Sequence, residues 1–175
     1  MQKRLNVQNG FTLLEVIAVL VILGILSAIA VNRWTNLDAE VYAGANALKT
    51  HLRYAQAQAM NRNPNVDDNT IMGITYNATS KQYWLFSGTN TASIQVLPGD
   101  LQYTTSSRTI DVPAKKITLD AAFTIYFDNR GIPYSAYTSS TVNTPLSSAQ
   151  SIVVSGLSGN QQITVTITPR TGYIP

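Results

Sequence analysis

The hydrophobic pattern of this chain begins with one long apolar run near the N-terminus. The run extends from Phe11 to Val31, and no charged side chain occurs between Glu15 and Arg33. A helix of this length spans roughly 30 Å, which is the thickness of the hydrocarbon core of a bilayer. The run therefore predicts a helix that can cross a membrane.

An amphipathic helix pattern continues directly from this run. Apolar residues recur at intervals of three and four, and the positions between them are polar. The apolar stripe consists of Trp34, Leu37, Val41, Ala45, Leu48, Leu52, Ala55 and Ala59. No proline occurs before Pro64, so the pattern predicts a single helix from about Thr12 to Asn61. Its first half is apolar all round, whereas its second half has one face to bury.

After Asn63-Pro64-Asn65 the period of the pattern changes to two, which is typical of β-strands. Glycine, proline and asparagine separate the short runs as turn residues. Strands are predicted at 71–76, 82–86, 93–97, 101–104, 116–119, 123–127, 151–155 and 162–168. Short strands at such close spacing indicate antiparallel sheets, so the fold class is α+β. The segment 138–148 is rich in Ser and Thr around Pro145, and we expect an exposed loop there.

The charge and composition narrow the choice of partners. The formal net charge is +3, and charged residues make up only 12% of the chain. Lys3 and Arg4 supply two of these positive charges, so the remainder of the chain is close to neutral. Nothing in this balance indicates a polyanionic partner. The sequence contains no cysteine, which excludes disulfides.

Glu15 is the unusual residue of the apolar run, because an ionisable side chain in such a segment needs a partner. Thr12-Leu13-Leu14-Glu15 fits the capping box, in which a glutamate satisfies a backbone N–H at a helix start. A second interpretation involves the polar segment that ends at Gly10. A cut after Gly10 would leave a charged amine on Phe11, four residues from Glu15 on the same helix face. Glu15 could then neutralise this amine or that of a neighbouring copy.

These residues resemble a known signal. Lys3-Arg4, the stretch Gly10-Phe11-Thr12-Leu13-Leu14-Glu15-Val16 and the apolar run are similar to the class III signal of type IV pilins and type II secretion pseudopilins. The resemblance implies that prepilin peptidase cleaves after Gly10 and methylates Phe11, and that Glu15 serves filament assembly. It also implies the pilin fold, with a long N-terminal helix packed on antiparallel sheet.

The resemblance implies a division of the chain and a set of partners. Residues 1–10 would be a cleaved leader, 11–31 a transmembrane and filament-core helix, 32–62 an amphipathic helix half and 63–175 a β-rich head. The partners would be prepilin peptidase, other pilin or pseudopilin subunits and an inner-membrane assembly platform. Lys3 and Arg4 would keep the leader cytoplasmic, with the head in the periplasm before entry into a pseudopilus or pilus.

Gly24 lies within the apolar run and has two interpretations. Glycine lowers helix stability by up to ~1 kcal/mol relative to alanine, which makes Gly24 a candidate weak point where the helix loosens on assembly. A small residue also permits close packing of helices.

A second resemblance lies in the last third of the chain. Phe127-Asp128-Asn129-Arg130-Gly131 is followed by two predicted strands and by Thr168-Pro169-Arg170-Thr171-Gly172-Tyr173. This order is similar to that of H-type minor pseudopilins and related minor pilins. In that group the protein is a low-copy subunit associated with filament assembly or the filament tip.

Two alternatives for the function stay open. Ala28-Ile29-Ala30 also fits an ordinary secretory signal cut after Ala30, which would release a soluble β-rich domain. Some H-like minor pilins take up DNA through a basic C-terminal segment. Here that region offers only Arg170 and Tyr173, with Arg108, Lys115-Lys116 and Arg130 elsewhere, so nucleic acid is not the expected partner.

The residues needed for common catalytic and metal sites are sparse. His51 is the one histidine and cysteine is absent, so neither a catalytic triad nor a usual zinc site is predicted. Six aspartates could in principle contribute to a calcium site, but they do not form a spaced loop. They are Asp67, Asp68, Asp100, Asp111, Asp120 and Asp128. We expect no enzyme activity, no metal and no cofactor.

Overall fold

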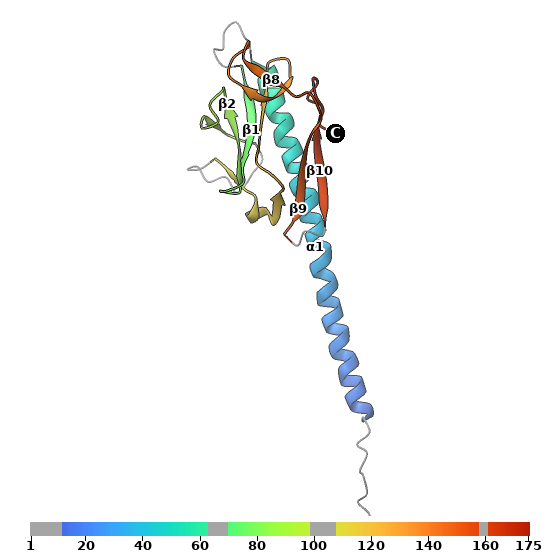
Figure 1. Ribbon diagram of the computed structural model, residues 1–175. Coiled ribbons are helices and arrows are strands. Elements are labelled where there is room, and N and C mark those ends of the chain that lie inside the picture. Colours follow the sequence, from blue (N-terminus) through green and yellow to red (C-terminus); the bar gives the residue numbers. More distant parts are fainter. Residues whose placement is uncertain (1–11, 63–69, 99–107, 158–160) are drawn as a thin grey trace, which may run out of the picture. The chain divides into compact units, whose positions relative to one another are not determined.

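A computed structural model describes residues 12–62, 70–98, 108–157 and 161–175, without the side chains of residues 28–38 (Figure 1). The chain divides into two compact units, Met1–Asn36 and Leu37–Pro175. One helix, α1 (Leu13–Met60), contributes to both units. Its bounds confirm the single helix predicted from about Thr12 to Asn61.

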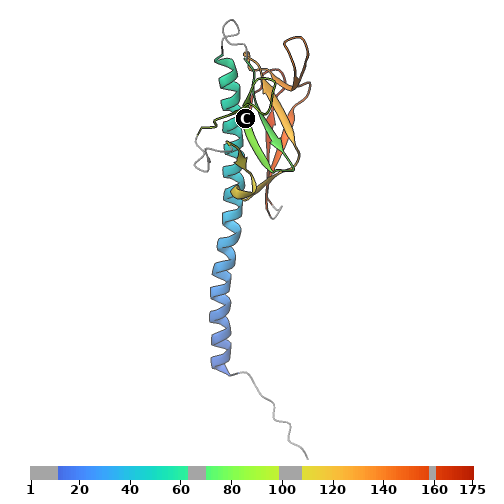
Figure 2. The same ribbon diagram turned by 90° about the vertical axis from the view of Figure 1, so that its left-hand side faces the viewer.

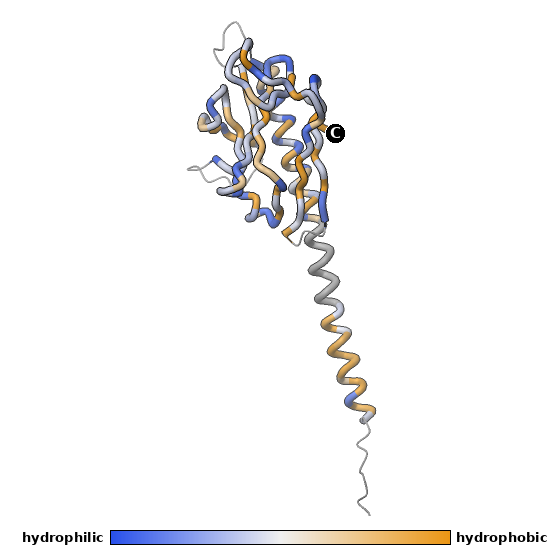
Figure 3. Tube along the Cα trace, viewed as in Figure 1, coloured by the Kyte–Doolittle hydropathy of each residue, from blue (hydrophilic) through white to orange (hydrophobic). Residues whose placement is uncertain are grey.

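In the N-terminal unit, the described side chains of α1 are uncovered. Every residue from Thr12 to Ser27 is exposed, and Figure 3 shows this part of the helix as mostly hydrophobic. In the described part of the chain, no helix combines the length and apolarity needed to cross a membrane. The prediction for 11–31 also covers Phe11 and the side chains of 28–31, which lie outside the described residues.

In the C-terminal unit, α1 buries the predicted apolar stripe. Its members there are each at most 1% exposed: Val41, Ala45, Leu48, Leu52, Ala55 and Ala59. Trp34 and Leu37 of the same stripe lie outside the described side chains. The three-and-four spacing therefore identified the buried face of the helix correctly.

The larger sheet of the C-terminal unit is seven-stranded and has the order β3-β2-β1-β6-β7-β8, with β4 also paired to β2. All of its pairings are antiparallel. Its strands are β1 (Met72–Asn77), β2 (Gln82–Ser87), β3 (Ile94–Gln95), β4 (Ile110–Asp111), β6 (Phe123–Phe127), β7 (Pro133–Tyr137) and β8 (Asn143–Pro145). In its centre Ile74 lies opposite both Leu85 and Ile125, and the three side chains are almost fully buried.

The smaller sheet is three-stranded, antiparallel and ordered β10-β9-β5. Its strands are β5 (Ile117–Leu119), β9 (Gln150–Gly156) and β10 (Gln162–Ile167), and a short 3₁₀-helix, η1 (Pro113–Lys115), precedes β5. One hydrophobic cluster joins the buried stripe of α1 to both sheets, through residues such as Ile125 and Val165. The strands lie along one side of this part of α1 (Figure 2).

The structure confirms most of the predicted strands and corrects two points. Three strands were not predicted, namely β4, β7 and β8. The segment 138–148 is not wholly an exposed loop, because β8 pairs with β7 and Leu146 is buried. Proline misled the prediction here, since Pro133 is the first residue of β7 and β8 is a short edge strand, both places where a strand accepts proline. The predicted strand at 101–104 lies outside the described residues.

Candidate functional site

Of the predicted processing and assembly residues, the structure describes Glu15, which lies in the first turn of α1. Gly10 and Phe11 lie outside the described residues. Thr12 is described, and its hydroxyl oxygen accepts a hydrogen bond from the Glu15 backbone N–H at 3.2 Å. This is one of the two hydrogen bonds of a capping box, and such a cap contributes about 1 kcal/mol to a helix.

The Glu15 carboxylate itself is exposed. Among the described residues it does not form the reciprocal hydrogen bond that would complete the capping box. The Thr12 side chain thus caps the helix, and the carboxylate stays available to another group. Capping therefore explains Thr12 better than it explains Glu15.

The apolar half of α1 surrounds this carboxylate with large uncovered side chains. Those from Leu13 to Leu26 that are large and apolar are between 48% and 79% exposed. Such an area is unfavourable in water at about 25 cal/mol per Å², so it calls for lipid or for other apolar chains. Within the described chain, no other segment provides that cover.

The space beside Gly24 is open among the described residues. A methyl group built at this position would meet no atom within 4 Å. The Ser27 hydroxyl, one turn further on, donates to the Leu23 carbonyl at 2.7 Å, a side-chain bond to the backbone that slightly destabilises and often bends helices. Close packing through Gly24 is thus not used within the described part of this chain, and the weak-point interpretation stays a prediction.

In the C-terminal unit, the segment 127–131, the first of the two segments that carry the second resemblance, folds into a tight turn around Asp128. This carboxylate is only 4% exposed and accepts hydrogen bonds from the backbone N–H groups of Arg130 and Ile132, both at 2.9 Å. It also accepts from the Arg130 guanidinium at 3.1 and 2.9 Å and from the Tyr134 hydroxyl at 2.9 Å. The buried charge is therefore fully compensated, as a stable buried carboxylate requires.

The Asp128 cluster shifts the ionisation of its neighbours. Burial raises the pKa of Tyr134, and the hydrogen bond to Asp128 raises it further. The hydrogen bonds and charge of Asp128 also raise the pKa of Arg130. Both shifts favour the protonated forms of Tyr134 and Arg130, which donate the hydrogen bonds of the turn.

The segments 127–131 and 168–173 meet on α1. The Gln56 side-chain amide donates hydrogen bonds to the carbonyl of Gly131, in the first segment, at 2.9 Å and to that of Thr171, in the second, at 3.0 Å. Gly131 and Gly172 have positive φ of 76° and 63°, and a methyl group on Gly172 would lie 2.6 Å from both the Gly131 carbonyl and the Gln56 amide. Both glycines are therefore required by backbone conformation and by close approach.

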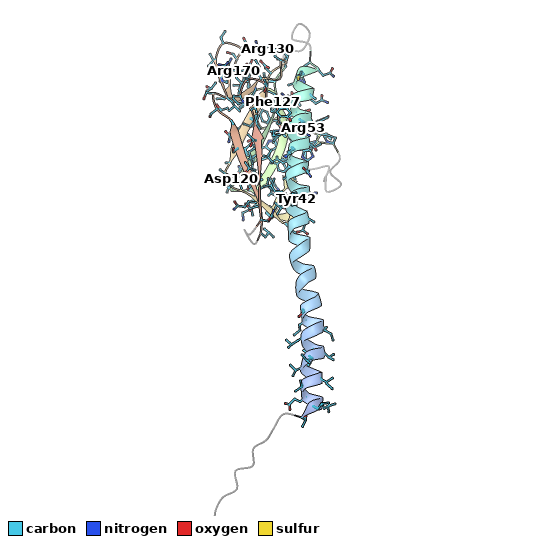
Figure 4. All side chains as sticks on the ribbon, turned by 90° about the vertical axis from the view of Figure 1, so that its right-hand side faces the viewer. Tyr42, Arg53, Asp120, Phe127, Arg130 and Arg170 are labelled. Carbon is cyan, nitrogen blue, oxygen red and sulfur yellow. The ribbon has the colours of Figure 1, made fainter. Side chains whose placement is uncertain are left out.

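The C-terminal residues are held on the same helix, one turn earlier. Arg53 donates two hydrogen bonds to the Ile174 carbonyl, at 3.1 and 2.7 Å, and the Ile174 side chain is buried. Figure 4 shows Arg53 on α1 and Arg130 at the end of the unit where these segments meet. The two segments are thus one structural element, fixed to α1 by Arg53 and Gln56.

A cavity of about 470 Å³ lies between α1 and the η1–β5 region. Its lining residues are Glu40, Ala43, Gly44, Ala47, His51, Tyr83, Ala114, Lys115, Lys116 and Ile117. Glu40 forms an ion pair with Lys116, while its other carboxylate oxygen is buried without a partner among the described residues. His51 is buried and its Nδ1 lies 2.9 Å from the Tyr83 hydroxyl. The one carboxylate and one imidazole lie about three helical turns apart on α1, too far to act together in catalysis.

The aspartates considered for calcium do not converge in the described structure. Asp67, Asp68 and Asp100 lie outside the described residues. Asp111 and Asp120 each accept a backbone N–H, from Ala114 and Val153 respectively. Within the described ranges, no group of three His, Cys, Asp or Glu side chains has the spacing to hold a metal ion.

Comparison with known proteins finds one match, at the N-terminus. Residues 5–31 match the family model described as the prokaryotic N-terminal methylation motif. No curated protein and no solved structure matches the chain. The matched segment contains Gly10, Phe11 and Glu15, the residues on which the first resemblance rests.

Proposed function

We propose that this protein, whose N-terminus carries the class III signal of pilins and pseudopilins, is a minor subunit of a type IV pilus or of a type II secretion pseudopilus. The motif makes it a pilin-like protein whose precursor is processed by prepilin peptidase. The finer assignment to the H-type, and to a low-copy position in the filament, belongs to the proposal.

The single observation that carries the proposal is the exposed, wholly apolar half of α1 with one carboxylate near its start. The Glu15 carboxylate is exposed and does not complete the capping box, while the large apolar residues from Leu13 to Leu26 are at least 48% exposed. A membrane covers such a surface before assembly, and helices of other subunits cover it afterwards. In that apolar bundle Glu15 neutralises an N-terminal amine and so sets the register between subunits.

In this account the protein works by assembly and is not an enzyme. The precursor lies in the inner membrane with its head in the periplasm, and the assembly platform moves it into the filament. One contact supports the H-type assignment. The Gln56 amide bonds to both segments that resemble H-type pseudopilins, so these segments form one structural feature although they lie far apart in the sequence.

Replacement of Glu15 by valine tests the proposal. Glu15→Val keeps the apolar run and the Thr12 cap, so we expect normal cleavage and membrane insertion. Filament incorporation should fall at least about tenfold, because an uncompensated amine in an apolar bundle costs more than the 1.4 kcal/mol of a tenfold change. The measurement is the share of the subunit that cosediments with filaments sheared from host cells.

Leu14→Val is the matched control, since it changes an exposed neighbour without touching the carboxylate. It should incorporate as the wild-type protein does. Wild-type incorporation of Glu15→Val would contradict the assembly role and leave Glu15 as a residue of the helix start only.

A further inference from the structure

One long stretch of the C-terminal unit carries no charge. From Gly131 to Pro169 the sequence contains no Asp, Glu, Lys, Arg or His, although charged residues make up 12% of the chain. The stretch comprises β7, β8, β9 and β10. Depletion of charged residues is the compositional mark of an interface core, whereas an ordinary solvent-facing surface of this size carries several charges.

Within this stretch β10 is an edge strand. Among the described residues it pairs with β9 alone, over six consecutive residues and without a bulge. Natural edge strands are normally shielded by a charge, a proline, a bulge or short length. The described β10, from Gln162 to Ile167, has none of these protections.

The register shows which backbone groups face outward. Gly156 N–H donates to the Gln161 carbonyl at 3.1 Å, so these residues form a hydrogen-bonded pair of the ladder. The pairs alternate along an antiparallel ladder, which directs the backbone groups of Ile163, Val165 and Ile167 towards β9. The backbone N–H and C=O groups of the residues between them, Gln162, Thr164 and Thr166, therefore point away from β9.

The hydrogen bonds of the partner strand β9 support this assignment of the inward and outward backbone groups of β10. Val153 lies opposite Thr164, and its backbone groups are engaged on the other side, with Asp120. The side chains alternate in the same way, since Val165 and Ile167 are buried while Gln162 and Thr164 are exposed. Among the residues that the structure describes, this free edge of β10 thus presents backbone groups without a strand partner beside neutral polar side chains.

We propose that the free edge of β10 is a strand-addition site, which accepts an uncharged, extended segment of a neighbouring subunit in the filament. Main-chain hydrogen bonds give affinity in this mode of recognition, and the neutral surroundings favour a neutral segment over a charged one. The inference rests on the proposed function, because a low-copy subunit has other subunits as its neighbours.

The geometry allows a sharp test in the full-length chain. Thr164→Pro removes one outward N–H and leaves the bonds from β10 to β9 in place, as proline is accepted on an edge strand whose N–H faces solvent. Thr164→Val is the matched control, because it keeps the N–H and the β-branched shape. We expect Thr164→Pro to lower filament incorporation about tenfold and Thr164→Val to change it less than twofold.

Two further measurements distinguish misfolding of Thr164→Pro from loss of the strand-addition site. Purified Thr164→Pro should unfold within a few degrees of the wild-type protein. If it does not fold, Thr164→Lys provides the same block by placing a charge at the edge without altering the backbone. Wild-type incorporation of whichever folded edge variant is used would overturn the strand-addition site while leaving the proposed function intact. Absence of the wild-type protein from filaments would overturn both.

Discussion

The Gln56 amide donates a hydrogen bond to the carbonyl of Gly131 at 2.9 Å, across 75 positions of the sequence. The same amide nitrogen also donates to the Thr171 carbonyl at 3.0 Å. One side chain of α1 thus fixes two separate turns of the β-rich head. This contact links the second half of α1 to the segments 127–131 and 168–173.

Gln56→Ala should therefore destabilise the folded protein by about 1–3 kcal/mol, because two hydrogen bonds are lost, of which the one to Gly131 is partly buried. The free energy of unfolding of the purified chain, from urea denaturation, measures the effect. Asn46→Ala is the control, since it changes an exposed polar residue of the same helix. An equal effect of the two substitutions would show that the bridge contributes nothing.

A methyl group at Gly172 should be more damaging than one at Gly24. Gly172→Ala forces a side chain into a positive φ and against the Gly131 carbonyl, so we expect a loss of more than about 2 kcal/mol. Gly24→Ala is the opposite case, because its helix position is open and alanine favours a helix by about 0.5–1 kcal/mol. The thermal unfolding midpoints of both variants, compared with that of the wild-type protein, measure these effects. An unchanged midpoint for Gly172→Ala would contradict the close approach of Gly172 to the Gly131 carbonyl.

Asp128→Asn should cost about 2–5 kcal/mol, because the amide cannot accept all the hydrogen bonds that converge on the buried carboxylate. Urea denaturation again provides the measurement. Asp120→Asn is a suitable control, since this exposed residue accepts one backbone N–H that an amide oxygen can also accept. A loss below 1 kcal/mol for Asp128→Asn would mean that the turn is held by other contacts.

The stability of the head should fall at high pH. The pKa of Tyr134 is raised above its ordinary value of 10.0, chiefly by burial and then by the hydrogen bond to Asp128. Below pH 10 both folded and unfolded tyrosine keep their proton, so this contribution is fully present. Above pH 10 the unfolded chain binds fewer protons than the folded one, and stability is lost as pH rises through the folded pKa.

Urea denaturation between pH 8 and pH 11 measures this loss. Tyr134→Phe should show a shallower decline than the wild-type protein, because one of the tyrosines that burial protects is removed. Tyr76, Tyr126 and Tyr137 have raised pKa values as well, so part of the decline should persist. Identical pH profiles for Tyr134→Phe and the wild-type protein would contradict the assignment.

Local patterns predicted the parts of the fold that depend on local physics. The three-and-four spacing from Val41 to Ala59 identified both the helix and its buried face, and alternation identified strands such as β6 and β9. The strands β7 and β8 were missed because proline and serine-rich composition is also that of a loop. Pairing with neighbouring strands decides between a strand and a loop, and a single sequence does not display that pairing.

The candidate site likewise contains residues that local sequence predicts and residues that only the fold brings together. Gly10, Phe11 and Glu15 are close in sequence, so their motif is readable without a structure. The junction at Gln56 was not predictable, because its partners lie 75 and 115 positions away and glutamine is an ordinary residue on a helix surface. The available signal in the sequence was the presence of Gly131 and Gly172, since glycine within a short polar motif often marks a turn with positive φ. The structure shows positive φ at both residues.

We propose that this chain is a processed filament subunit. The intact mass and N-terminal sequence of the protein purified from its host membrane test this most directly. We expect a mature chain that starts at Phe11 and carries a methyl group on its N-terminal amine. A chain that starts near Val31 would contradict it, because the apolar half of α1 and Glu15 would then be absent from the mature protein.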